Sequence, residues 1–114
     1  MTSMNQILLE CTVCEDAKTT EKSLRTVTIC PVLYTNDYKT AEGEIVKEKA
    51  FFDIELYGEF GEMLKPSLKK GKEIRIVGRL KQERYTDSYG KEHSKVSIIA
   101  EHIDFKKAKE ERYL

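Results

Sequence analysis

The stretch that decides the fold is residues 50–81, AFFDIELYGEFGEMLKPSLKKGKEIRIVGRLK. Its first eight residues alternate bulky and polar side chains, with the two-residue period of a half-buried strand. Residues 59–70 change to helical spacing, with acidic residues in the first turn and lysines in the last. Pro66 predicts that this helix is kinked or in two pieces, and residues 72–81 alternate as a strand again. The stretch therefore predicts one helix between two strands.

Three further strands are predicted outside this stretch, at residues 7–14, 24–33 and 95–105. Polar residues 15–22 separate the first two, and Pro31 predicts a sheet edge or a bulge because it cannot donate a ladder hydrogen bond. Residues 34–49 predict a long hairpin excursion with turns at Asn36-Asp37 and Gly43, and residues 87–90 predict another turn. The order β-β-β-α-β-β is typical of an OB-fold, an all-β, five-stranded Greek-key barrel with one helix between strands 3 and 4.

The length and composition predict one domain without a membrane or export signal. With 114 residues, we expect a barrel over residues 1–105 and a short charged tail over 106–114. No apolar run approaches the roughly 18 residues that a membrane span needs, and the N-terminus lacks the basic region of a signal peptide. We therefore expect a cytoplasmic protein whose three cysteines, an odd number, are reduced thiols.

Motifs for catalysis or metal binding are missing from the sequence. There is no glycine-rich phosphate loop, G-x-S-x-G or H-E-x-x-H. His93 and His102 are nine residues apart on a predicted strand, and such a spacing is typical of surface residues rather than metal ligands. Cys11 and Cys14 form a C-x-x-C inside a strand without a second ligand pair, so we interpret Cys11 as packing. The sequence predicts neither an enzyme nor a cofactor.

Aromatic and basic residues on the predicted sheet favour a binding surface. The formal net charge is zero, but residues 65–114 carry fourteen basic and eight acidic groups. Rings interleaved with cations suit single-stranded nucleic acid, because every base offers a face for stacking and cations neutralise phosphates. The alternative is that the rings cover a barrel end or a subunit interface. The candidate side chains are Phe51, Tyr57, Tyr85 and Tyr38, with Lys47, Lys49 and Arg79 among the cations.

These segments resemble the bacterial single-stranded DNA-binding protein family. The chain opens with M-N-Q-I-L-L at 4–9, like the family's M-N-x-V-I-L start. The resemblance strengthens over F-F-D-I-E-L-Y-G (51–58), L-K-K-G (68–71), I-V-G-R-L (76–80), R-Y-T-D-S-Y-G-K (84–91) and I-I-A-E-H-I-D-F (98–105). It covers residues 4–105, nearly the whole chain, with the motifs in matching order.

The resemblance implies an OB-fold that assembles, usually as a homotetramer, and binds single-stranded DNA without sequence preference. It implies roles in DNA replication, recombination and repair, and a location at the bacterial nucleoid. Family base-stacking positions fall on Phe51, Tyr57, Tyr85 and Tyr38. Family phosphate contacts fall on Lys70, Lys81 and Arg84. A dimer is the alternative assembly, motivated like the tetramer by apolar residues outside the strand alternation, namely Leu8, Val27 and Ile99.

Several positions depart from the family pattern. Glu59 and Glu83 stand where the family usually has basic residues, so we expect weaker DNA binding than in a fully basic member. The sequence ends in KEERYL, where the family continues into an acidic tail that recruits replication and repair enzymes. A tailless variant and a truncated chain both fit this ending. The alternative functions are an OB-fold protein-interaction subunit with weak DNA binding and an RNA-binding module.

Overall fold

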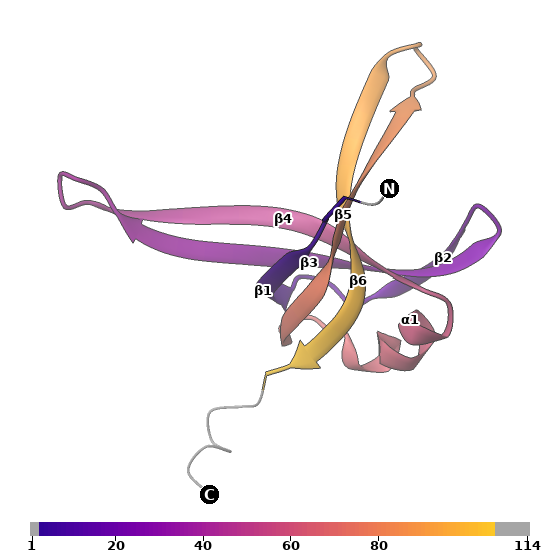
Figure 1. The fold of residues 1–114 in the computed structure, drawn as a ribbon, viewed down its shortest axis with the longest axis horizontal. Coiled ribbons are helices and arrows are strands. Elements are labelled where there is room, and N and C mark those ends of the chain that lie inside the picture. The colour runs from indigo at the N-terminus through magenta and orange to yellow at the C-terminus, as the bar shows by residue number, and fades with distance from the viewer. Residues whose placement is uncertain (1–2, 107–114) are drawn as a thin grey trace, which may run out of the picture.

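The computed structural model describes residues 3–106 and consists of long, paired strands with a short helix below them (Figure 1). The strands are β1 (Ile7–Val13), β2 (Lys18–Lys22), β3 (Arg25–Lys39), β4 (Ile45–Tyr57), β5 (Glu73–Thr86) and β6 (Glu92–Phe105). Between β4 and β5 lie the helix α1 (Gly58–Leu64) and the single 3-10 turn η1 (Lys65–Ser67). The helix is therefore in two pieces, as Pro66 predicts, because proline is tolerated only in the first turn of a helix.

Five of the strands close into a barrel. Their order is β1-β5-β6-β4-β3, and β1 returns to β3 through Thr12↔Leu33 and Val13↔Val32. All pairs are antiparallel except β4 with β6, which run parallel through Ile54↔Ile98 and Glu55↔Ile99. The helix lies between the third and fourth barrel strands, so the predicted OB-fold is confirmed.

Strand β2 is the element that the sequence prediction missed. Its five residues, KTTEK, fall in the stretch predicted to separate two strands, and four of them are exposed. Such a segment has no apolar face to signal a strand, and its conformation comes from pairing with β3, from Lys18↔Ile29 to Lys22↔Arg25. Ser23 and Leu24, both with positive φ (50° and 64°), form the tight turn between them.

The β3–β4 hairpin is also longer than predicted. Asn36 and Asp37 lie within β3, paired with Glu48 and Lys47, so the turn predicted there is wrong. The ladder continues to Lys39↔Ile45, and the turn is made around Gly43, whose φ is 89°. Because thirteen consecutive residue pairs outweigh a local turn preference, the hairpin projects far from the barrel (Figure 1).

Pro31 lies at an edge and not at a bulge. The β3–β4 ladder runs through Pro31↔Asp53 without a register shift. On the other side of β3, β2 pairs only as far as Ile29, and β1 pairs from Val32 onward. Pro31 therefore sits in the gap between these two neighbours, where its carbonyl accepts the Cys14 N–H at 2.8 Å and its missing donor breaks no ladder bond.

The core is aliphatic and fills the barrel. Ile54, Leu56, Ile74, Ile76 and Ile98 come from β4, β5 and β6, and each is at most 1% exposed. Leu68, beyond η1, closes one end together with partly buried Phe60 and Leu64 of the helix. In the same helix Met63, which has the helical spacing of Phe60 and Leu64 in the sequence, is exposed.

The three cysteines are unpaired, and two of them pack in the core. Cys11 and Cys30 are buried in the core cluster, and burial raises the pKa of each thiol to about 12. Within residues 3–106, no cluster of three His, Cys, Asp or Glu side chains is placed to hold a metal ion. No helix in this part of the chain is both long and apolar enough to cross a membrane.

Two of the three residues predicted to leave apolar surface for an oligomer interface are buried within the chain. Val27 is fully buried and Ile99 is 6% exposed. Only Leu8, on β1, remains exposed, at 71%.

Candidate nucleic-acid interface

One face of the sheet collects most of the predicted binding residues. In β4 the odd-numbered residues point away from the core, since the even-numbered Ile54 and Leu56 are fully buried inside the barrel. The register Glu55↔Ile99↔Arg79 carries this face across β6 and β5. We call it the outer face; its charged and aromatic members are Lys47, Lys49, Phe51, Asp53, Glu55 and Tyr57 of β4, Arg79, Lys81, Glu83 and Tyr85 of β5, and His93 and Lys95 of β6.

Phe51 is the most exposed of the three candidate aromatic side chains on this face. It is 71% exposed although it lies in the middle of a paired strand. It borders an open depression of about 520 Å³, whose other lining residues include Pro31, Lys95 and Val96. Lys95 is fixed beside it by an ion pair with Asp53 at 2.6 Å. A planar group can therefore reach the Phe51 ring without displacing any side chain of the core.

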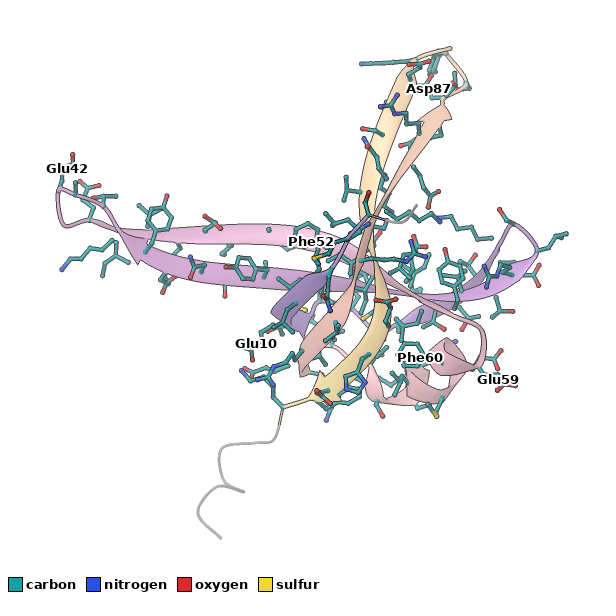
Figure 2. The ribbon with its side chains drawn as sticks, viewed as in Figure 1. Glu10, Glu42, Phe52, Glu59, Phe60 and Asp87 are labelled. Carbon is teal, nitrogen blue, oxygen red and sulfur yellow. The ribbon has the colours of Figure 1, made fainter. Side chains whose placement is uncertain are left out.

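Tyr85 forms a second aromatic platform, stacked on His93. The two ring centroids are 5.2 Å apart and the planes are inclined by 19°. His93 Nε2 lies 2.7 Å from the carboxylate of Asp87, at the tip of the β5–β6 hairpin (Figure 2). Asp87 also accepts the backbone N–H groups of Tyr89 and Lys91, and these hydrogen bonds, led by the one from His93, lower its pKa. Asp87 of the hairpin turn therefore holds His93, and with it the stacked pair, in place.

His93 was predicted to be a surface residue, and the prediction of sites missed its stacking. The predicted turn at 87–90 would place Tyr85 opposite Glu92, whereas the loop of the structure, between Thr86 and Glu92, is one residue longer and places Tyr85 opposite His93. A cross-strand pair of this kind is found from sequence only when the length of the loop is known, because one residue more or less changes the partner.

Tyr57 is held in a different way from the other two aromatics. The guanidinium of Arg25 lies 5.0 Å from its ring centroid, a cation–π arrangement. Its hydroxyl donates to Glu55 Oε1 at 2.6 Å and accepts from Lys81 Nζ at 3.2 Å. The ring is half-buried, so an approaching base meets the Arg25 guanidinium as well as the ring.

Four charged residues form a network beside Tyr57. Lys22 donates to Glu55 at 3.2 Å and to Glu83, while Lys81 lies 3.2 Å from Glu83 and 4.0 Å from Glu55. The hydrogen bond from Lys22 lowers the pKa of Glu83, and the one to Glu83 raises the pKa of Lys22. The hydrogen bond with Tyr57 raises the pKa of Lys81. Lys22, Lys81 and Glu83 are therefore charged at neutral pH, and Lys81 is not a free cation.

The remaining basic candidates divide between the outer face and other places. Lys47, Lys49 and Arg79 are exposed on the outer face. Lys70 lies in the connection between η1 and β5, where its backbone N–H donates to Asp16 at 2.8 Å. It is therefore not brought together with the others.

Tyr38 and Arg84 are even-numbered residues on the hairpin strands and point to the opposite side from the outer face. Tyr38 pairs with Val46 and is 47% exposed, and Arg84 pairs with Ser94. The structure thus brings seven of the ten candidates to one face, namely Phe51, Tyr57, Tyr85, Lys47, Lys49, Arg79 and Lys81.

Comparison with known proteins points to one family. The Single-strand binding protein family matches residues 4–106. A single-stranded DNA-binding protein of Aquifex aeolicus is 40% identical over 70 residues, which are 61% of this chain and 47% of that protein. The protein of the same description from Wolinella succinogenes is 39% identical over 66 residues, 58% of this chain and 41% of the other. The aligned segment thus spans about half the length of these curated relatives.

Solved structures support the fold. The Plasmodium falciparum SSB in complex with ssDNA superposes with a TM-score of 0.83 at 16% identity, covering 94% of this chain and 98% of the other. A deletion mutant of the single-stranded DNA binding protein from Thermus aquaticus gives a TM-score of 0.79 at 21% identity, covering 93% of this chain and 52% of that one. At these identities the likeness establishes the barrel and its topology.

Proposed function

Because the chain belongs to the single-strand binding protein family, we propose that it binds single-stranded DNA without reading base sequence. The observation that carries the proposal is the outer face itself. It combines two exposed aromatic platforms, Phe51 and Tyr85, with basic side chains on one continuous sheet surface. Stacking is worth roughly 1–3 kcal/mol per base and is indifferent to which base is stacked.

The geometry supports separate roles for the aromatic and the basic residues of the outer face in binding a DNA strand. Phe51 and the Tyr85–His93 pair supply surfaces on which unpaired bases stack. Lys95 lines the same depression as Phe51. Lys47, Lys49 and Arg79 supply charges for the phosphates between stacked bases. Duplex DNA buries its base faces in its own stack, so this surface favours single strands.

The wider role follows from the same proposal. A protein that covers unpaired bases without sequence preference suits the protection of DNA during replication, recombination or repair, and acts by binding rather than catalysis. We propose that the chain works as an oligomer, a homotetramer or a dimer, since Leu8 presents an exposed apolar side chain on β1.

The experiment is a titration of fluorescently labelled oligo(dT) followed by anisotropy at two salt concentrations, with duplex DNA as a competitor. We expect binding that weakens with salt: for each phosphate neutralised, log K should fall by about 0.7 per tenfold rise in salt concentration. Duplex DNA should not displace the bound oligo(dT). Size-exclusion chromatography with light scattering, with and without oligo(dT), gives the assembly state. An oligomer that binds no DNA even at low salt would refute the proposal and favour a protein-interaction subunit.

A further inference from the structure

The charge network beside Tyr57 joins three strands that are far apart in sequence. Lys22 comes from β2, Glu55 from β4, and Lys81 and Glu83 from β5. None of the functional expectations from sequence includes Lys22, because β2 itself carries no sequence signal. Its place in the network results from the β2–β3 hairpin, which bends over the same side of the barrel.

Glu55 is the fixed member of this network. Its side chain is only 2% exposed, and it contacts both lysines and the Tyr57 hydroxyl. A buried carboxylate that loses its cations carries a large desolvation penalty, so at least one positive charge must stay beside it. Glu55 therefore keeps at least one of Lys22 and Lys81 beside it, and in this structure it contacts both.

Glu83 is the exchangeable member. Its side chain is 32% exposed and reaches the two lysines from the solvent side. The four charges sum to zero, and without Glu83 the lysine pair over Glu55 would carry one uncompensated positive charge. A single phosphodiester, with one negative charge, would restore neutrality in place of the Glu83 carboxylate.

We propose that Lys22 and Lys81 form a phosphodiester site on the outer face, in which Glu83 stands in for the phosphate until single-stranded DNA displaces it. The inference rests on the proposed function and adds to it a binding residue, Lys22, and an internal competitor, Glu83. The site lies next to Tyr57 and Arg25, so a phosphate bound there leaves its base beside a cation and an aromatic ring.

The test compares two charge-neutralising variants of the same hairpin. Glu83→Gln removes the stand-in, whereas Glu92→Gln makes the same change in net charge on β6, on the opposite face, at an exposed residue. Oligo(dT) affinity is measured by anisotropy at several salt concentrations. We expect Glu83→Gln to bind about fivefold more tightly than the wild type, and Glu92→Gln to stay within about twofold of it.

The salt dependence gives a second readout. When DNA binds the wild type, it releases cations from its phosphates, but the displaced Glu83 carboxylate attracts one cation from solution. Glu83→Gln has no such carboxylate, so the net number of cations released is larger. The slope of log K against log salt should therefore steepen by up to about 0.7 in Glu83→Gln and stay unchanged in Glu92→Gln.

A double variant assigns the effect to Lys22. Lys22→Gln with Glu83→Gln leaves Lys81 to neutralise the buried Glu55, so the double variant keeps the network neutral, and its thermal unfolding shows whether it is folded. We expect it to lose the gain in affinity. Equal affinity and slope for Glu83→Gln and Glu92→Gln, or a gain that persists without Lys22, would overturn the inference while leaving wild-type DNA binding intact. Absence of binding by the wild type and all variants at low salt would refute the proposed function and the inference with it.

Discussion

Replacing Phe51 by alanine should weaken DNA binding while leaving the barrel folded. Only about a third of the ring is covered in the free protein, since it is 71% exposed. For a side chain of about 200 Å², burial of that share is worth roughly 1.5 kcal/mol at about 25 cal/mol per Å². A domain of this kind has a free energy of unfolding of about 5–15 kcal/mol, so the variant stays folded. The loss of one stacked base, by contrast, costs roughly 1–3 kcal/mol, or about 5- to 150-fold in affinity for oligo(dT).

The assay is anisotropy with labelled oligo(dT), with urea unfolding of each variant measured in parallel. Phe51→Tyr keeps the ring and should bind within about twofold of the wild type. Met63→Ala removes a side chain of nearly equal exposure, 70%, from helix α1 and should leave affinity unchanged. If Phe51→Ala binds like the wild type, or if Met63→Ala weakens binding equally, then Phe51 does not stack a base.

Three further outcomes follow from the structure. Tyr38→Ala should change oligo(dT) affinity by less than about twofold, because Tyr38 points away from the outer face; a loss as large as that of Phe51→Ala would place DNA on both sides of the hairpin. Gly78→Ala should lower the free energy of unfolding by about 1–3 kcal/mol in urea titrations, since a Cβ there would collide with the backbone carbonyl of Ile99 at the β5 bulge, and an unchanged midpoint would contradict this packing. The folded-state pKa of Glu83 is lowered from 4.5 by its hydrogen bond from Lys22, so its contribution to stability is present above pH 4.5 and is lost as pH falls through the lowered value. Urea titrations across this range should show the stability difference between the wild type and Glu83→Gln shrinking in acid, and a constant difference would argue against the ion pair.

The stretch from Ala50 to Lys81 predicted the strand–helix–strand order at the centre of the fold, and three further strands completed the OB-fold order. Alternation in 50–57 and 72–81 reports which side of a strand meets the core, and this period is a local property of the chain. The break at Pro66 and the turn at 87–90 were likewise predicted from local stereochemistry, which does not depend on distant residues. The same alternation placed Phe51 and Tyr57 on the face away from Ile54, where the structure has them.

Tertiary pairing decided what local sequence could not. Strand β2 exists because β3 offers it a partner, and Asn36-Asp37 is extended because a long ladder overrides a weak turn preference. Glu55 is buried where it contacts Lys22 of β2 and Lys81 of β5, which no pattern within β4 reveals.

The sequence by itself therefore determined the barrel, its helix and the residue types of the candidate interface. The tertiary structure alone decided which residues of different strands share a face, with Tyr85 on His93 and Lys22 beside Lys81, while Tyr38 and Arg84 point to the opposite side. The physical reason is that periodicity is set by neighbouring residues in one strand. Register, closure and charge pairing are set by contacts between strands that are distant in sequence.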